Sequence, residues 1–397
     1  AHFRYYRKRW DKAGIAMISK LIFLSPAHTL RGGIAASTER LAREFMDRGA
    51  AVRIYSFRVQ YPALLFPGKT QYTDDPAPEG LDIEPVLHSI SPVNWWRVGN
   101  RLRSEKPGLV ISRFWIPFMG PCLGTVQRLA RRNGHTRVVG LVDNLIPHER
   151  RVGDLPLTRY YLRATDGFVA MSRSVWTDIR THAPGKPAAY TPHPIYDNYG
   201  PKSERAAALA RLGLPADRAY LLFFGFVRAY KGLDLLLEAL GRPELREQPL
   251  DLIVAGEFYE DPTPYRNRIE QLGLRRRVHL FDRYIPREEV RHFFAAADLV
   301  TQPYKSATQS GITQLAYQFE RPMLVSEVGG LPEIVEHGQT GYVVAPEPGA
   351  IAAGIRDFFE HGREAEMTRE VARQKHRFSW AQLADTLLAV YEELRPH

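Results

Sequence analysis

The segment from Pro303 to Val344 constrains the fold of this chain more than any other stretch. A short apolar run ends at Pro303, small polar residues follow, and Ile312 and Leu315 resume an apolar pattern at helical spacing. This order predicts a strand, a tight loop and the first turn of a helix. Because a helix N-terminus combines free N–H groups with the positive end of the dipole, the loop predicts a seat for an anion such as phosphate.

The same order is repeated directly afterwards. Pro322–Ser326 is typical of a buried strand, Val328–Gly330 supplies a flexible turn, and Leu331–Val335 opens another short helix. One such turn is often only a connection between a strand and a helix. Two in succession favour two phosphate-sized helix termini close together in the sequence.

This segment resembles the donor-binding signature of family 4 of the GT-B glycosyltransferases. In that family the second helix opening is written GGxxE and is followed by N/H-G-x-x-G-x-L/V; here these positions are Gly329, Gly330 and Glu333, then His337–Val343. The resemblance covers most of the chain. It implies two doubly wound, Rossmann-like α/β domains that face each other across a cleft, with a C-terminal helix that crosses back to the N-terminal domain.

One departure concerns two acidic residues. Many family members carry a Glu in the first loop and another eight positions later, whereas alignment on Gly311 puts Thr308 at the first position and Leu315 or Ala316 near the second. Hydroxyl and amide side chains can both donate and accept hydrogen bonds. The sugar and ribose contacts are therefore expected from Thr308, Gln309, Ser310 and Gln314, with Gly311, Gly330 and Glu333 completing this part of the donor site.

Bulk composition places the chain among ordinary globular proteins. Its 397 residues, 44% hydrophobic and 25% charged, suffice for two domains. The net charge of +10 favours negatively charged partners such as nucleotide phosphates or an anionic membrane surface. No nucleic-acid-binding motif is present, so nucleic acid is not an expected partner. The single Cys122 excludes an intramolecular disulfide, and no apolar run of about 18 residues is present. We expect a cytoplasmic protein, with peripheral contact at the inner membrane surface left open.

The chain is divided as follows on sequence grounds. Residues 1–16 are basic and aromatic and precede Met17, which looks like a natural start, so they are interpreted as an expression remnant or an extension; an interfacial membrane segment is the alternative. Prolines and polar residues between 191 and 203 predict a boundary. We expect an acceptor-binding domain over 17–200, a donor-binding domain over 201–376 and the returning helix over 377–397.

The N-terminal half alternates predicted strands and helices. Gly32 and Gly33 follow the first strand and let backbone approach a ligand closely, although an ordinary glycine loop is the alternative. In the family resemblance this loop faces the donor phosphate and the acceptor. Trp95 and Trp96 are interpreted as packing residues at a helix start rather than as a sugar platform. Strands are predicted at Leu21–Ser25, Val52–Phe57, Leu81–Leu87, Leu109–Ser112, Val138–Val142 and Gly167–Met171, with helices at Trp95–Glu105, Leu123–Arg132 and Thr158–Ala164.

Polar residues cluster directly after the strand that ends at Val142. Asp143 or His148 could orient an acceptor hydroxyl or take its proton. Related enzymes often carry His-Asp or His-Asn at this point, so the motif is displaced or substituted here. A helix cap formed by Asp143 or Asn144 is the alternative.

In the C-terminal half, Arg228 and Lys231 are predicted to stabilise a departing diphosphate. Lys231 stands at the lysine of the family motif G-R-x-x-x-x-K-G, whereas Phe226 occupies the arginine position and Arg228 would have to replace it. The remaining predicted donor contacts are Gly225, Glu257 and Tyr284, the last of which could stack on a base. Strands are predicted at Tyr220–Gly225, Leu250–Ala255, Val278–Phe281, Leu299–Pro303, Met323–Ser326 and Tyr342–Ala345, and a final helix at Ala381–Leu394.

Taken together, the resemblance implies a retaining glycosyltransferase that moves a glycosyl group from a nucleotide-diphosphate sugar to a hydroxyl of a glycan or lipid-linked glycan. Neither a cofactor nor a metal is expected, because the cations and backbone amides carry the charge and no Asp-x-Asp triplet is present. Two alternatives stay open: a GT-B sugar-nucleotide epimerase, and a non-catalytic nucleotide-sugar-binding protein, which the missing carboxylates favour.

Overall fold

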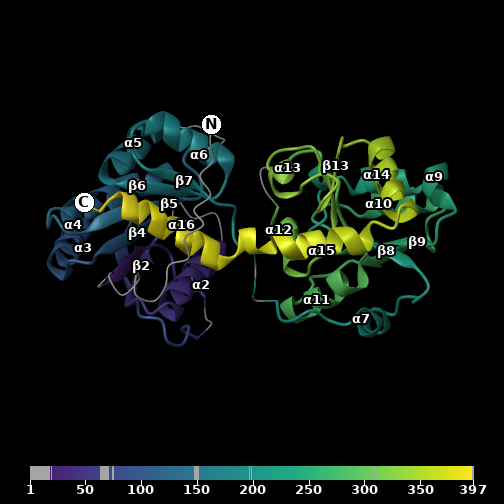
Figure 1. The fold of residues 1–397 in the computed structure, drawn as a ribbon, viewed down its shortest axis with the longest axis horizontal. Helices are drawn as coiled ribbons and strands as arrows, with labels where there is room; N and C mark the ends of the chain where they lie inside the picture. Colours follow the sequence, from purple (N-terminus) through teal and green to yellow (C-terminus); the bar gives the residue numbers. More distant parts are fainter. Residues whose placement is uncertain are drawn as a thin grey trace. The chain divides into compact units, whose positions relative to one another are not determined.

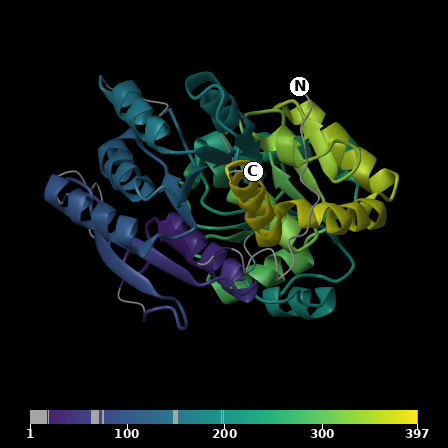
Figure 2. The same cartoon turned by 60° about the vertical axis from the view of Figure 1, so that its left-hand side comes forward.

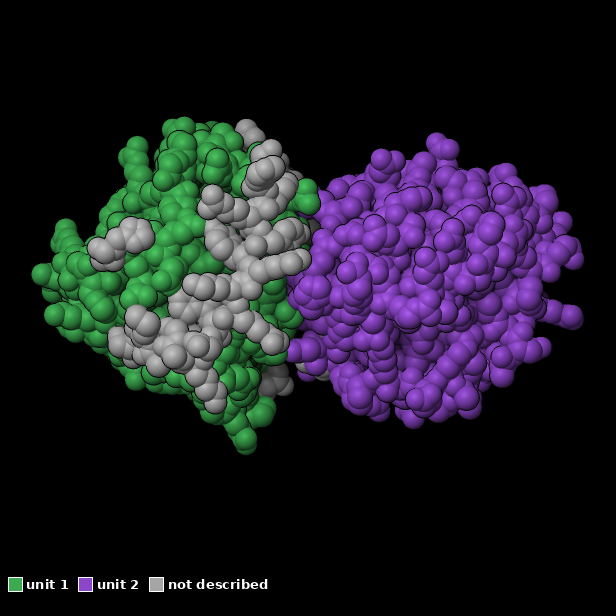
Figure 3. Space-filling model, viewed as in Figure 1, with its two compact units in different colours: residues 1–193, 379–397 green, residues 194–378 purple. Residues whose placement is uncertain are grey.

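The computed structural model describes residues 18, 20–62, 71–73, 76–146, 152–195, 197, 199–307 and 310–395. The chain forms two compact units: unit 1 holds residues 1–193 and 379–397, and unit 2 holds residues 194–378 (Figure 3). Residues 1–16, His148, Thr308 and Gln309, all singled out by the sequence, lie outside the described residues.

Unit 1 is built on a seven-stranded sheet with the order β3-β2-β1-β4-β5-β6-β7, and all of its strand pairs are parallel. Strands β1, β4, β5 and β6 are buried almost throughout because helices cover both faces, whereas the edge strands β3 and β7 are largely half-buried. The strands are β1 (Leu21–Leu24), β2 (Val52–Val59), β3 (Ile83–His88), β4 (Leu109–Phe114), β5 (Arg137–Val142), β6 (Gly167–Ala170) and β7 (Ala188–Tyr190).

The helices of unit 1 lie in two layers (Figure 1). Helices α3, α4 and α5 lie side by side, whereas α16 packs on α2 and on β5, β6 and β7. Gly167 permits the approach of α16, since a Cβ there would lie 2.6 Å from Val390 Cγ1. The helices are α2 (Gly33–Asp47), α3 (Pro92–Glu105), η2 (Pro117–Met119), α4 (Gly120–Arg131), α5 (Asp154–Ala164), α6 (Arg173–His182) and α16 (Trp380–Glu393).

Unit 2 repeats the architecture with a six-stranded sheet of order β10-β9-β8-β11-β12-β13, again parallel in every pair. The chain order reverses at β8, which pairs with β9 on one side and with β11 on the other. The strands are β8 (Ala219–Phe224), β9 (Leu250–Ala255), β10 (Val278–Phe281), β11 (Leu299–Gln302), β12 (Met323–Ser326) and β13 (Gly341–Val344).

Helices cover both faces of this second sheet as well, and two separate apolar clusters form the core on either side of it. Figure 2 shows the helices of both units from a second direction. The helices are α7 (Arg205–Leu212), η3 (Ala229–Lys231), α8 (Leu233–Leu240), α9 (Pro243–Arg246), α10 (Thr263–Gln271), α11 (Arg287–Ala296), α12 (Gly311–Gln318), α13 (Leu331–Ile334), α14 (Pro348–Glu360), α15 (Glu364–Gln374) and η4 (Lys375–Phe378). Among the described helices none is long and apolar enough to cross a membrane.

The predicted class, two doubly wound α/β sheets with a long C-terminal helix, is confirmed. Most predicted strands match within two residues at either end. The short edge strand β7 and several surface helices were not predicted. The helix predicted to start at Trp95 begins at Pro92, where Ser91 caps it by accepting a hydrogen bond from the Asn94 N–H. A capping serine followed by proline is a start signal that the two tryptophans obscured.

We expect two glycines of unit 2 to respond differently to alanine. Gly232 and Gly213 have nearly the same φ, 70° and 68°, but a Cβ on Gly232 would lie 1.9 Å from the Pro303 carbonyl oxygen while one on Gly213 would meet nothing within 4 Å. Gly213→Ala should therefore cost about 1 kcal/mol, the strain of the left-handed backbone alone. Gly232→Ala should cost about 3 kcal/mol. Equal losses in denaturant unfolding would contradict the close approach of Gly232 to Pro303.

Candidate functional site

Unit 2 contains a cavity of about 570 Å³, a size typical of sites for small ligands. It lies where β8, β9 and β10 end and α12 begins, beside the point at which the strand order reverses. Doubly wound sheets bind ligands at this position. The lining residues are Tyr199, Phe224, Gly225, Phe226, Lys231, Ala255, Gly256, Glu257, Tyr284, Ile285, Arg287, Val290, Gly311, Ile312 and Leu315.

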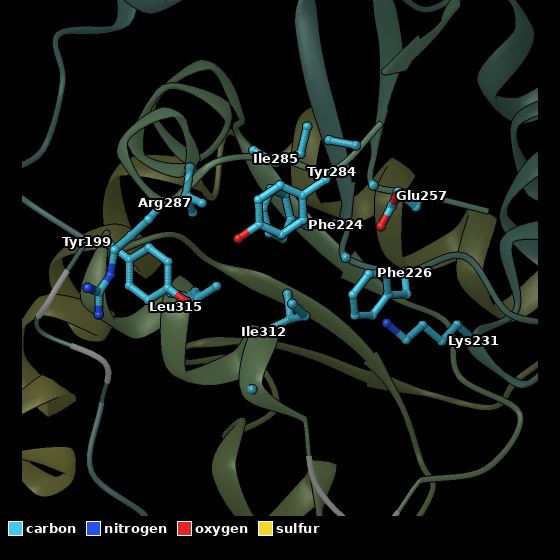
Figure 4. Close-up of a pocket in the computed structure, with 15 residues that line it drawn as sticks. Tyr199, Phe224, Phe226, Lys231, Glu257, Tyr284, Ile285, Arg287, Ile312 and Leu315 are labelled. Carbon is cyan, nitrogen blue, oxygen red and sulfur yellow. The ribbon is translucent and has the colours of Figure 1, made fainter. Parts of the chain in front are cut away.

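Five residues predicted to contact the donor line this cavity: Gly225, Lys231, Glu257, Tyr284 and Gly311. They come from four separate connections, and the parallel sheet brings them to one edge. Figure 4 shows the cavity from end to end: Lys231 and Phe226 lie at one end, and Tyr199 and Arg287 lie at the other.

Two glycines allow the backbone to close around one end of the cavity. Gly225 follows β8 with φ 91°, and Gly256 follows β9 with φ 145°. A Cβ on Gly256 would lie 2.3 Å from the Gly225 carbonyl oxygen, and a Cβ on Gly225 would lie 3.3 Å from Lys231 Nζ. Side chains at either position would therefore push the strand ends apart or displace the lysine amine.

Lys231 is the most unusual titratable group in the cavity. Its side chain is 8% exposed, and within the described part of the chain no carboxylate pairs with its amine. The Nζ atom lies 5.8 Å from the Tyr304 ring centroid. Burial lowers the pKa of Lys231 to about 8, and the nearby charge of Arg228 acts in the same direction. A buried ammonium that lacks a protein counter-charge is positioned to receive an anion.

Arg228, the second predicted cation, is not among the residues that line the cavity. Its guanidinium lies 4.8 Å from the Tyr259 ring centroid, and that ring stacks on Phe226 with centroids 4.2 Å apart. Arg228 and Lys231 are only three residues apart in the sequence. The exposed ring of Tyr259, stacked on Phe226, nevertheless holds Arg228 by a cation–π contact. Arg228 therefore influences the cavity through its charge on Lys231 and not as part of its wall.

The N-terminus of α12 supplies the cavity wall opposite the strand ends. Ser310 caps this helix: its hydroxyl accepts a hydrogen bond from the Ile312 N–H at 3.2 Å and lies 3.3 Å from the Tyr304 hydroxyl. Gly311 follows as the first helical residue and lines the cavity. Gln314, one turn later, is 4% exposed, and its amide oxygen has no hydrogen-bond partner among the described residues.

The second predicted helix terminus is weaker than the sequence suggested. Helix α13 is a single turn, and two of its N–H groups are already used, because Leu331 donates to the Val328 carbonyl and Glu333 to the Gly330 carbonyl. Neither Gly330 nor Glu333 lines the cavity. One short turn with two N–H groups already used carries little dipole, so this turn offers phosphate a weaker seat than the N-terminus of α12 does.

The far end of the cavity was missed by sequence reasoning. Arg287, at the start of α11, places its guanidinium 5.4 Å from the Tyr199 ring centroid, and burial raises the pKa of Tyr199. The wall between this pair and Lys231 is apolar and aromatic, with Phe224, Ile285 and Tyr284, the last 64% exposed. Tyr199 lies in the proline-rich stretch interpreted only as a boundary, so no local pattern marked it.

In unit 1 the Gly32–Gly33 loop leads into α2. Gly32 has φ 117° and forms the N-terminal boundary of the helix, a conformation that requires glycine. A Cβ at either glycine would meet nothing within 4 Å, so the space beside the loop in this unit is open.

Asp143 is held by a group that the sequence analysis did not single out. Arg113, at the end of β4 and 4% exposed, donates from Nε and Nη2 to the two carboxylate oxygens of Asp143, both at 2.7 Å. Its remaining nitrogen donates to Ser37 Oγ at 2.6 Å in the first turns of α2. The next described helix, α5, begins at Asp154 with Gly153 as its cap, so the helix-cap alternative for Asp143 or Asn144 is wrong. An arginine near the end of a buried strand, here Arg113, was the signal in the sequence that could have predicted a partner for Asp143.

Among the described residues no group of three or more His, Cys, Asp or Glu side chains is arranged to hold a metal ion.

Comparison with known sequences identifies relatives over nearly the whole chain. The family described as Glycosyl transferases group 1 matches residues 204–375. The chain is 30% identical over 412 aligned residues to the D-inositol 3-phosphate glycosyltransferase of Streptomyces avermitilis, covering 95% of this chain and 87% of that protein. It is 26% identical to the protein of the same name from Thermobifida fusca, covering 91% and 88%.

Comparison with solved structures shows the same fold. A glycosyltransferase from Rickettsia africae superposes with a TM-score of 0.67 at 14% identity, covering 94% of this chain and 98% of the other. HepE from Anabaena, solved in complex with UDP and glucose, gives 0.57 at 18% identity, covering 95% and 98%. At these identities the likeness concerns the fold alone.

The ion pair in unit 1 predicts a loss of stability when one partner is removed. Asp143→Asn leaves the buried Arg113 guanidinium without its counter-charge and should cost about 2 kcal/mol, since Asp143 itself is partly exposed. The double variant Arg113→Met/Asp143→Leu should lose less free energy of unfolding than the sum of the losses in its two single variants. Thermal and denaturant unfolding of Asp143→Asn, of the single variants Arg113→Met and Asp143→Leu, and of the double variant measures these losses. An Asp143→Asn protein as stable as the wild type would show that the pair does not support the fold.

Proposed function

Because the chain belongs to the Glycosyl transferases group 1 family, whose members are enzymes that use nucleotide-sugar donors, we propose that it is a retaining transferase for a hydroxyl acceptor. The acceptor class is a glycan or a lipid-linked glycan. In the reaction, the bond between the anomeric carbon and the β-phosphate oxygen breaks, the acceptor oxygen bonds to that carbon, and the acceptor proton leaves. Family membership sets aside the epimerase and the non-catalytic alternatives.

The observation that carries this proposal is the buried amine of Lys231. A charged group in a poorly hydrated cavity without a protein counter-ion destabilises the free protein and is stabilised when an anion arrives. The diphosphate of a nucleotide sugar is such an anion, and its negative charge grows as the glycosyl bond breaks. Lys231 and the N-terminus of α12, at Ser310 and Gly311, are assigned to this leaving group.

The remainder of the cavity is assigned to the nucleoside. Its apolar and aromatic wall suits a base and a ribose better than it suits further phosphate, with Tyr284 available to stack on the base and Glu257 to accept from a hydroxyl. Solved complexes of the Anabaena protein contain UDP and glucose, so UDP-sugars are the first donors to test. The names of the relatives add D-inositol 3-phosphate as an acceptor to test beside lipid-linked glycans.

Unit 1 is assigned to the acceptor, through the Gly32–Gly33 loop and the segment that begins at Asp143. Since Arg113 donates to both oxygens of that carboxylate, we assign Asp143 to positioning of this segment and leave proton transfer to His148 as a prediction. No resident metal is proposed, because Lys231 and the α12 terminus supply the positive charge.

Replacement of Lys231 should lower turnover strongly. Lys231→Met removes the charge at similar length, and we expect kcat to fall by about 30- to 1,000-fold, the range for loss of one preorganised charge stabiliser. Lys305→Met is the matched control, because Lys305 is exposed and paired with Asp234 at 2.7 Å. The assay measures sugar transfer from a donor panel with EDTA present. A Lys231→Met enzyme within twofold of wild type would refute the assignment, and wild-type transfer abolished by EDTA would refute the metal-independent part.

Donor binding should weaken as the pH rises. The folded, free protein has a Lys231 pKa of about 8, below the ordinary lysine value, so the amine loses its proton in a range where most lysines keep theirs. If only the charged amine binds the diphosphate, the dissociation constant should rise about tenfold between pH 7 and pH 9. Calorimetric titration with UDP-sugar across this range tests the prediction. Lys231→Met should bind UDP-sugar more weakly at every pH, and its dissociation constant should not depend on pH in this range. A pH dependence that persists in this variant would show that another group titrates.

A further inference from the structure

Positive charge is divided unequally between the two units. Unit 1 contains 30 Lys and Arg against 18 Asp and Glu, a net charge of +12, whereas unit 2 contains 24 against 26, a net charge of −2. Without residues 1–17 unit 1 still carries +8. The positive excess of the whole chain therefore belongs to unit 1. A field of this sign attracts anionic surfaces to one part of the molecule.

An apolar strip lies on the same unit. Six large hydrophobic side chains are exposed in its described part, and three of them fall within seven residues: Ile90 (49% exposed), Val93 (59%) and Trp96 (61%). Ile90 lies two residues before the start of α3, and Val93 and Trp96 lie in its first two turns. Single exposed apolar residues are common in soluble proteins, but three at the start of one helix form a local patch.

The two adjacent tryptophans of α3 have different surroundings. Trp95 packs against the core of unit 1, and its indole N–H donates to the His88 carbonyl at 2.7 Å. Trp96 points away from that core and is exposed. The interpretation of both as packing residues is thus correct for Trp95 and wrong for Trp96. The packing of α3 is completed by Val98 and Leu102 on the buried side, so Trp96 is not needed for it.

Basic residues continue the exposed face of α3 beyond the apolar strip. Arg97 and Arg103 are exposed, and their helical spacing puts them on the face that carries Val93 and Trp96. Arg101 contributes less charge, because Glu84 and Glu105 pair with it. A helix that presents tryptophan and aliphatic side chains together with arginine is typical of segments that lie in a membrane interface.

We propose that the exposed face of α3 docks unit 1 on an anionic lipid surface. Trp96 and Val93 enter the headgroup region, and Arg97 and Arg103 contact lipid phosphates. Charge complementarity selects this occupant over a protein partner, since the strip is small and unit 1 is strongly positive. The inference deepens the acceptor part of the proposed function, because a lipid-linked acceptor lies in such a surface. It assigns membrane contact to α3 without relying on residues 1–16.

Vesicle sedimentation of the full chain tests the proposal without donor or turnover, so its outcome is independent of the transfer reaction. We expect binding to vesicles of phosphatidylcholine mixed with phosphatidylglycerol, weak binding to phosphatidylcholine alone, and loss of binding at high salt. Arg97→Gln/Arg103→Gln should weaken binding about tenfold or more. The control pair Arg276→Gln/Arg369→Gln removes the same charge from exposed positions of unit 2 and should bind like the wild type. Equal loss in both pairs would overturn the assignment to α3.

Tryptophan quenching by brominated phosphatidylcholine in the same anionic vesicles places the contact. Trp96→Phe keeps the apolar ring and removes the fluorophore, so this variant should sediment with the vesicles yet lose most of the quenching. Trp96→Ser should bind several-fold more weakly, with an unchanged melting temperature because the side chain is exposed. Quenching that survives in Trp96→Phe would place the lipid contact on another tryptophan and overturn the proposal, as would failure of the wild type to bind anionic vesicles.

Discussion

The structure of the candidate site depends on one close approach of backbone to backbone. Gly256 lies so near the Gly225 carbonyl that it could not carry a side chain, and a side chain on Gly225 would crowd the buried Lys231 amine. Gly232, pressed against Pro303, fixes the start of α8 and thereby the position of the lysine. The amine is charged, poorly hydrated and without a carboxylate partner among the described residues.

Burial of this charge has a cost in the free protein. The pKa of Lys231 is lower in the folded protein than in the unfolded chain. From about pH 8 upward to the unfolded pKa, the unfolded chain therefore binds more protons than the folded protein does, and the free energy of unfolding rises with pH. At neutral pH the lysine therefore destabilises the fold, which is typical of functional groups. The apolar wall that desolvates the amine also shapes the rest of the cavity, so packing and function share the same residues.

In unit 1 a second buried cation has the opposite surroundings. Arg113 is satisfied by both oxygens of Asp143 and by Ser37, and it connects β4, the end of β5 and the first turns of α2. The pair gives the unit a fixed polar centre at the carboxyl ends of its strands. Lys231 and Arg113 thus show two ways of burying a positive charge: one is left open to a ligand, and the other is closed by the protein.

The sequence by itself determined the α/β class, the repeated doubly wound pattern and most strands, because buried parallel strands and glycine-rich turns are local signals. It also singled out Gly225, Lys231, Glu257, Tyr284 and Gly311, which the structure gathers on one cavity. Only the tertiary structure decided that Arg228 stacks on Tyr259 and that Arg113 forms an ion pair with Asp143. It also decided that Trp96 is exposed while Trp95 is packed. These outcomes depend on partners distant in the chain and on the rotation of a helix about its axis, and neither is encoded in the spacing of neighbouring residues.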